Sequence, residues 1–106
     1  MMITLYGSAL CPDCRECKEN FDQLGIEYTL VDICASMRNL KSFLDLRDRL
    51  PLFLHSKEIG DIGIPALMLE DGTVTLDWEG YLATLGLSVL YRETGAQACS
   101  LDHKNC

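Results

Sequence analysis

The sequence predicts an α/β domain in which a four-stranded mixed sheet has helices on both faces. Three patterns support this fold class: a strand–helix–strand unit in residues 3–31, a helical middle in residues 37–59, and a hairpin pattern in residues 64–76. A chain of 106 residues has room for one compact domain. We expect the element order βαβα(α)ββα, with the first two strands parallel and the last two antiparallel.

The first unit begins with residues 3–6, which alternate and are rich in strand formers, and Gly7 ends this strand. Pro12 suits the first turn of a helix, where its missing N–H costs nothing. Apolar side chains then recur at helical intervals, and Gly25 stands at the stop position; they are Cys14, Cys17, Phe21 and Leu24. A second strand is predicted at residues 28–31, parallel to the first because such crossovers are right-handed.

The middle of the chain is predicted to be helical. One apolar stripe lies among charged residues, and its members are Met37, Leu40, Phe43 and Leu44. Pro51 is expected to end this helix because it disfavours α geometry in the residue before it. Residues 52–59 are expected to form a short further helical piece that closes near Gly60.

The last third of the chain has a different pattern of residues. Residues 64–69 and 73–76 are apolar or β-branched and flank Glu-Asp-Gly, which indicates a hairpin. Residues 78–91 are predicted to form a weaker final helix that Gly86 interrupts. The two strands of the hairpin complete the predicted sheet.

Charge and hydropathy exclude some classes of function. The formal net charge is -7, from 16 acidic and 9 basic residues, and no basic run is present. This balance argues against a nucleic-acid partner. The N-terminus lacks the basic region of a signal peptide, and no apolar stretch has the length of a membrane span. We therefore expect a cytoplasmic protein with no nucleic-acid or membrane partner.

Six cysteines need an explanation, and they stand at positions 11, 14, 17, 34, 99 and 106. Three of them fall within seven residues, and no secretion signal precedes them. Clustered cysteines in a reducing compartment are more often redox-active or metal-binding than structural bridges. Both interpretations stay open at this point.

The motif Cys11-Pro12-Asp13-Cys14 lies directly between a predicted strand end and a predicted helix start. There Cys11 faces unpaired backbone N–H groups and the positive end of the helix dipole, which favour thiolate over thiol. Cys14 lies one turn deeper, where it can attack a mixed disulfide formed by Cys11. Zinc knuckles use the same C-x-x-C spacing, so the strand–helix context provides most of the specificity.

With these residues the sequence resembles the glutaredoxin family of the thioredoxin superfamily. The resemblance rests on the strand ITLYG (residues 3–7), the CPDC motif with its amphipathic helix, and Gly63-Ile64-Pro65 before the third strand. It extends over roughly residues 2–80. It implies a thioredoxin-like fold and a disulfide oxidoreductase that acts on protein or small-molecule disulfides.

The resemblance also implies a substrate site. Pro65 would be the cis proline that lies against the dithiol, and the backbone of Ile64 would pair with a bound substrate peptide. We place Tyr6, Pro12 and Asp13 in the same substrate-binding set. Cys11 and Cys14 are the expected catalytic residues, and no tightly bound cofactor or metal is expected.

Two departures from the family pattern concern the thiol and the reductant. Asp13 replaces the usual aromatic residue, and its charge is expected to make Cys11 a less acidic thiol. The usual lysine before the first cysteine and the Gly-Gly followed by acidic residues are missing. Asp77 and Glu79 remain candidates for holding glutathione's amino group, although both also suit a helix start. The electron donor is therefore left open between glutathione and a thioredoxin-reductase-type flavoprotein.

The C-terminal cysteines have several possible roles. We assign residues 1–93 to the glutaredoxin-like domain and residues 94–106 to a cysteine-containing tail. Within the tail, Cys99 and Cys106 are accessory thiols that would pair with each other, act as resolving thiols, or join His103 in a metal site.

Cys17 lies in the same cluster of cysteines as the dithiol motif. Cys17 is either a small buried apolar residue or a third thiol that exchanges with Cys14, and Cys34 has no assigned role. The competing class is an iron–sulfur or zinc-binding module that uses the clustered cysteines. On a continuous helix, however, ligands at 11, 14 and 17 spread by about 9 Å along the axis, too far for one small cluster.

Overall fold

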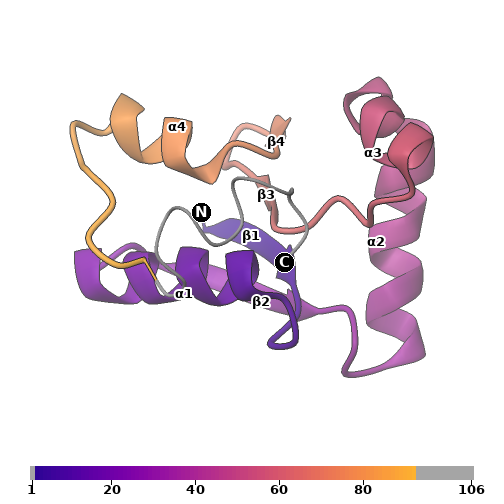
Figure 1. Cartoon of the computed structure of the whole chain (residues 1–106), viewed down its shortest axis with the longest axis horizontal. Coiled ribbons are helices and arrows are strands. Elements are labelled where there is room, and N and C mark those ends of the chain that lie inside the picture. The colour runs from indigo at the N-terminus through magenta and orange to yellow at the C-terminus, as the bar shows by residue number, and fades with distance from the viewer. Residues whose placement is uncertain (1, 93–106) are drawn as a thin grey trace.

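The computed structural model describes residues 2–92, in which a four-stranded mixed sheet forms the centre (Figure 1). The strands are β1 (Ile3–Gly7), β2 (Tyr28–Asp32), β3 (Ala66–Met68) and β4 (Val74–Thr75). They lie in the order β2-β1-β3-β4, with β1 and β2 parallel and the other two pairs antiparallel. The predicted mixed sheet and its strand directions are confirmed.

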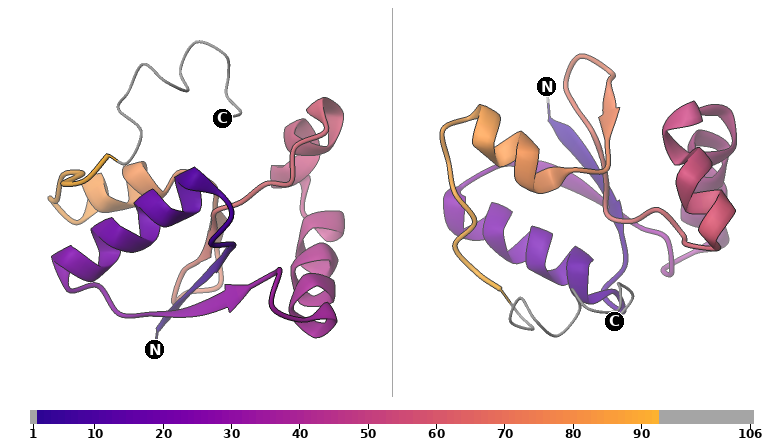
Figure 2. Two further views of the ribbon diagram at one scale, coloured as in Figure 1. Left: turned by 60° about the horizontal axis from the view of Figure 1, so that its bottom comes forward. Right: turned by 45° about the horizontal axis from the view of Figure 1, so that its top comes forward.

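Within the described residues, five helical elements surround the sheet: α1 (Pro12–Leu24), α2 (Met37–Arg49), the 3-10 turn η1 (Pro51–Phe53), α3 (Leu54–Ile59) and α4 (Trp78–Thr84). α1 and α4 lie at one side of the sheet, and α2 and α3 lie at the other (Figure 2). α2 ends immediately before Leu50 and Pro51, as predicted. Within the part of the chain that the structure describes, no helix is long and apolar enough to cross a membrane.

In residues 2–92 two apolar clusters form the core, one on each face of the sheet. Because side chains alternate along a strand, Ile3 and Leu5 point to one face and Tyr6 points to the other. The buried residues of the first cluster come from the sheet, α1 and α4: Ile3, Leu5, Cys17, Phe21, Leu67, Trp78 and Leu82. Those of the second come mainly from the sheet, α2 and η1: Tyr6, Ile33, Phe43, Leu46, Phe53 and Ala66. The predicted two-sided arrangement is confirmed.

The predicted apolar stripe of α2 is wrong at its first position. Met37 is 68% exposed, whereas Phe43 and Leu46 are buried in the second cluster. Phe43 and Leu46 lie one helical turn apart, and Met37 begins the helix about 9 Å earlier along its axis, at 1.5 Å per residue. Met37 therefore lies beyond the part of α2 that packs on the sheet.

The predicted final helix over residues 78–91 is also wrong, because α4 ends at Thr84. Gly86 adopts φ 76, a left-handed conformation that suits glycine, and its N–H donates to the carbonyl of Ala83 at 3.0 Å. The N–H of Leu87 donates to the carbonyl of Leu82, also at 3.0 Å. These two bonds close the helix C-terminus, so Gly86 ends the helix instead of interrupting it.

Residues 87–92 return without helical structure along α1, and we call this segment the strap (Figure 1). Asn20 on α1 is fully buried and holds the strap backbone: its Oδ1 accepts from the N–H of Leu90 at 2.6 Å and of Tyr91 at 3.0 Å. Its Nδ2 donates to the carbonyl of Tyr91 at 2.9 Å. The strap is thereby fixed to the middle of α1 and ends near the start of that helix.

Gly63, at the approach to β3, provides a test of packing. Its φ is 98, and an added Cβ would lie 2.8 Å from Cδ1 of Phe53, a buried ring of the second cluster. Gly63→Ala is therefore expected to cost about 2–3 kcal/mol of unfolding free energy in urea denaturation. Gly72→Ala is the matched control, since its φ is 91 but nothing lies within 4 Å of the added Cβ. Equal losses in the two variants would contradict the packing argument.

Candidate active site

Cys11 is the N-cap residue of α1, and its backbone is extended, with φ -100 and ψ 120. The carbonyl of Cys11 accepts the first helical hydrogen bond, from the N–H of Arg15 at 3.0 Å. Its Sγ accepts from the N–H of Cys14 at 3.4 Å, and the side chain is only partly exposed. The sulfur therefore lies where free N–H groups of the first turn stabilise negative charge.

The two thiols of the motif have opposite acidities. A hydrogen bond from the Cys14 thiol is the largest of the influences that lower the pKa of Cys11 to about 7. Burial opposes this shift, backbone hydrogen bonds from Cys14 and Asp13 add to it, and the charge of Asp13 opposes it. The same hydrogen bond, together with burial, raises the pKa of Cys14. Near neutral pH, Cys11 is thus the thiol that ionises, whereas Cys14 keeps its proton.

This difference leads to a pH prediction. The ultraviolet absorbance of the Cys11 thiolate is expected to rise with a midpoint near pH 7, and alkylation by iodoacetamide should accelerate over the same range. The sign follows from the shift: a lowered pKa means that the thiol is protonated and slow below the midpoint, and ionised and fast above it. The Cys11→Ser variant supplies the background to subtract. A midpoint near the ordinary thiol value of 9.0 would contradict the assignment.

Cys14 lies against the end of β1. Its side chain is buried, and a Cβ added at Gly7 would approach the Cys14 Sγ to 3.1 Å. Gly7 therefore leaves the space that lets the second thiol pack close to the sheet. Sequence reasoning treated Gly7 only as the end of a strand and missed this role, although a glycine shortly before the dithiol was a usable signal.

Pro65 lies at the same edge of the sheet as the dithiol. The Ile64–Pro65 peptide bond is cis, as the resemblance implied, and Pro65 is buried. Ala66, the next residue, pairs with Tyr6 in β1, which brings the start of β3 beside the end of β1. The part of the prediction that places Ile64 in contact with a substrate stays a prediction.

The backbone of Tyr6 in β1 lies near this edge, but its aromatic ring does not. The ring packs against Phe43 with centroids 5.9 Å apart in the second core cluster, and the residue is only 8% exposed. The structure therefore does not bring the Tyr6 side chain together with the thiols. Alternation along β1 turns it to the face that α2 covers.

Asp13 lies at the surface of the first helical turn, where its Oδ1 accepts from Nε1 of the buried Trp78 at 3.4 Å. Partial desolvation is the largest influence that raises the pKa of Asp13, and the charges of Glu16 and Glu79 add to it. The Asp13 charge in turn raises the pKa of Cys11, in the direction that the sequence predicted.

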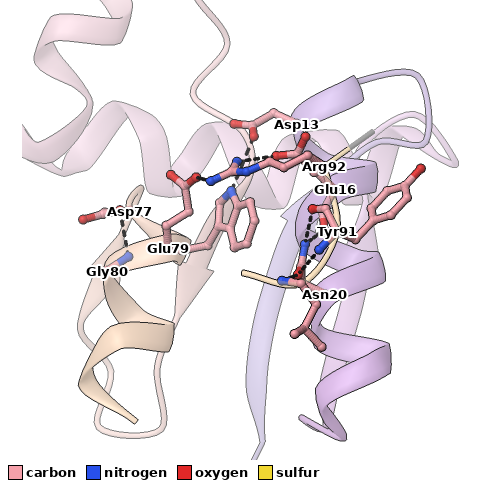
Figure 3. Close-up of polar contacts among 10 residues, drawn as sticks. Asp13, Glu16, Asn20, Asp77, Glu79, Gly80, Tyr91 and Arg92 are labelled. Carbon is pink, nitrogen blue, oxygen red and sulfur yellow. Dashed lines mark hydrogen bonds and ion pairs between the residues drawn. The ribbon is translucent and has the colours of Figure 1, made fainter. Parts of the chain in front are cut away.

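The two acidic candidates for glutathione binding already have internal partners (Figure 3). Asp77 caps α4, since its Oδ1 accepts from the N–H of Gly80 at 2.9 Å. Glu79 forms an ion pair with Arg92. The helix-start interpretation of Asp77 therefore matches the structure, and neither carboxylate is left without a partner inside the protein.

The remaining cysteines differ in their surroundings. Cys17 is fully buried in the first core cluster, and burial is the largest influence that raises its pKa, so it is a core residue in this structure. Cys34 is exposed, and its Sγ accepts a hydrogen bond from the Ser8 hydroxyl at 3.2 Å. The predicted roles of Cys99 and Cys106, and the predicted tail, lie outside the described residues.

The metal-binding alternative requires several cysteine side chains to meet at one point. Across residues 2–92, no group of three or more His, Cys, Asp or Glu side chains is placed to hold a metal ion. α1 is continuous from Pro12 to Leu24, so the helix does not unwind to gather its cysteines. Cys17 is buried in the first core cluster, whereas Cys11 lies at the helix start six residues earlier.

A thioredoxin-like α/β fold with a cysteine pair at the start of its first helix defines a thiol–disulfide oxidoreductase type of protein. The family model described as Glutaredoxin matches residues 3–67, from the start of β1 into β3. The matched region contains the dithiol motif and Pro65. The chain belongs to the glutaredoxin family.

Two further proteins are similar to the chain. An uncharacterized protein of Haemophilus influenzae is 44% identical over 73 residues, which cover 69% of this chain and 85% of that protein. The crystal structure of a glutathione S-transferase from Pseudomonas fluorescens aligns with a TM-score of 0.48 at 24% identity. That alignment covers 92% of this chain but 43% of the transferase, so the chain spans less than half of the transferase's length.

Proposed function

We propose that this protein is a dithiol disulfide oxidoreductase in which Cys11 is the nucleophile and Cys14 the resolving thiol. The observation that supports the proposal most directly is the pairing at the start of α1, where the N–H of Cys14 lies 3.4 Å from the Cys11 Sγ. The hydrogen bond between the two side chains lowers the pKa of Cys11 while it raises the pKa of Cys14, and the backbone bond helps to lower the pKa of Cys11 further, which divides the roles between the two thiols. Membership of the glutaredoxin family supports thiol–disulfide chemistry in general.

The proposed reaction transfers two electrons in two exchange steps. The Cys11 thiolate attacks one sulfur of the substrate disulfide, forms a Cys11–substrate disulfide, and releases the other sulfur as a thiolate that takes a proton. Cys14 then loses its proton and attacks the Cys11 sulfur, which releases the second substrate thiolate. The substrate ends as two thiols, and the protein ends with a Cys11–Cys14 disulfide.

The high pKa of Cys14 suits this order of events. While Cys11 is a thiolate, the Cys14 proton stabilises it through the thiol–thiolate hydrogen bond. Once Cys11 is bonded to the substrate, that negative charge is gone and so is the largest influence that raises the pKa of Cys14. Cys14 is therefore easier to deprotonate at the stage where it must attack.

We propose that the substrate binds at the edge formed by the dithiol and by Ile64 and Pro65, with Pro12 and Asp13 at its border. Both electrons reside on sulfur, so the reaction needs no tightly bound cofactor. The electron donor is glutathione or a thioredoxin-reductase-type flavoprotein. Because Asp77 and Glu79 already have internal partners, they do not by themselves identify glutathione as the donor. Turnover measured side by side with glutathione and with the flavoprotein decides between the two donors.

The proposed function is tested by mapping the disulfide that forms. Reduced protein is mixed with a disulfide-bonded peptide, quenched in acid, alkylated and digested for mass spectrometry. We expect one peptide disulfide reduced per chain and a Cys11–Cys14 bond, with Cys17 still alkylated after unfolding. In Cys14→Ser, a mixed disulfide on Cys11 should accumulate instead. Stoichiometric iron or zinc in the purified protein would support the metal-binding alternative, and a dithiol that stays fully alkylatable would contradict the proposed exchange.

A further inference from the structure

Arg92, at the end of the strap, joins two helices through its guanidinium group (Figure 3). Its Nη1 lies 2.6 Å from Oε1 of Glu16 on α1, and its Nη2 forms an ion pair with Oε2 of Glu79 on α4. The Glu16 side chain is only 8% exposed, so Arg92 covers a carboxylate that water reaches poorly. The fork geometry of arginine is suited to holding two carboxylates at once.

The same guanidinium lies over the ring of Trp78, with Cζ 5.9 Å from the ring centroid. Trp78 is buried, and its indole N–H donates to Asp13 inside the dithiol motif. A cation over an indole face is attracted by the ring electrons. A continuous chain of contacts therefore runs from Arg92 through Trp78 to the residue two places after Cys11.

The position of Arg92 is determined by a buried amide. Asn20 holds the backbone of Leu90 and Tyr91 through three hydrogen bonds, and Arg92 follows immediately. A strap held this way through its backbone presents its next side chain at a fixed place. The contact of Arg92 with Glu16, one turn nearer the start of α1 than Asn20, agrees with this direction.

The charges around Asp13 come from three elements. Glu16 of α1 and Glu79 of α4 raise the pKa of the Asp13 carboxyl, and Arg92 of the strap lowers it. The Cys11 thiol is influenced in turn by Cys14 and by the charge of Asp13. Asp13 thus lies beside the nucleophile with two further carboxylates acting on it, and the strap brings one guanidinium to this group.

We propose that Arg92 is a positioning residue of the dithiol site, which fixes Trp78 and Glu16 beside Asp13 and offsets the negative charge next to Cys11. Its role in catalysis rests on the proposed function, because it acts on the nucleophile named there. Its effect on the Cys11 thiol is measured without turnover. Arg92 does not touch the reacting sulfur, and it acts through Asp13 and its neighbours.

The test is the thiolate absorbance of Cys11 against pH in the full-length chain. Arg92→Gln is expected to raise the titration midpoint by about half a pH unit, because Asp13, the carboxylate that opposes the Cys11 thiolate, loses its counter-charge and opposes the thiolate more strongly. Glu79→Gln is expected to move the midpoint in the opposite direction. Shifts of opposite sign from two side chains of one ion pair are not what a merely loosened structure would give.

Two further variants show whether the effect passes through Asp13. In an Asp13→Asn background, Arg92→Gln should shift the midpoint far less than it does in the natural sequence. Arg92→Lys keeps the charge and should restore most of the original midpoint. The proposal is overturned if the folded Arg92→Gln protein titrates like the natural one, or if the shift is undiminished in the Asp13→Asn background. If Arg92→Gln does not fold, an unchanged midpoint in Glu79→Gln overturns it.

The outcome is distinguishable from a failure of the proposed function. If the natural protein forms the Cys11–Cys14 disulfide but Arg92→Gln leaves its midpoint unchanged, only the role of Arg92 is refuted. If the natural protein forms no such disulfide, the proposed dithiol mechanism is refuted whatever the titrations give.

Discussion

Replacing Cys11 by serine is expected to lower disulfide reductase activity by at least about a thousandfold, because a hydroxyl at this position stays protonated and is a far weaker nucleophile. The N-cap geometry should survive, since a serine hydroxyl also accepts hydrogen bonds from the first turn of α1. The loss should therefore appear in turnover, with little change in the free energy of unfolding. Steady-state reduction of a disulfide-bonded peptide, compared with urea unfolding, separates these two effects.

Two matched controls accompany this variant. Cys34→Ser changes an exposed thiol outside the motif and should keep nearly full activity. Cys14→Ser removes the resolving thiol and should stop multiple turnover while it retains the first attack, so that substrates stay trapped on Cys11. Full activity in Cys11→Ser would refute the proposed nucleophile, and loss of activity in Cys34→Ser would require a role for a third thiol.

Replacing Asn20 by leucine is expected to lower the free energy of unfolding by about 2–4 kcal/mol. This is the largest expected effect of any change outside the thiols. The variant keeps a side chain of similar size but leaves two N–H groups and one carbonyl of the strap without their buried partner. Urea denaturation measures the loss. Hydrogen exchange should show faster exchange at the amides of Leu90 and Tyr91 than in the natural protein.

Gln23→Leu is the control for this prediction. Gln23 lies on the same helix, and its side chain donates a hydrogen bond to Glu19 at an exposed position. Its replacement should change stability by no more than about 0.5 kcal/mol. If the two variants lose the same stability, the strap contributes little and the buried amide has another explanation.

Local patterns in the sequence predicted most of the elements. Pro12 and the spacing of Cys14, Cys17 and Phe21 predicted α1, and the structure has it from Pro12 to Leu24. Pro51 predicted the end of α2. These features depend on residues within one or two turns of each other, so a single sequence contains the information. The cis peptide before Pro65 came only from the family resemblance.

Features that depend on distant residues could not be predicted. Asn20 suggests a solvated helix position, since asparagine is mostly exposed, yet it is fully buried because the strap needs its hydrogen bonds. Arg92 pairs with Glu16 across 76 positions, and nothing near either residue indicates the pairing. The prediction of a final helix to residue 91 was wrong for the same reason, because the backbone of Leu90 and Tyr91 bonds to Asn20 on α1 rather than within a helix.

The dithiol itself was determined by the sequence alone. Cys11 and Cys14 are three residues apart at a helix start, and helix geometry by itself places one sulfur at the cap and the other a turn deeper. Only the tertiary structure decided what surrounds the pair: Gly7 beneath Cys14, Pro65 at the adjoining strand, and Arg92 with Trp78 beside Asp13. Local spacing fixes backbone geometry, whereas burial and charge at a site depend on which distant segments pack there.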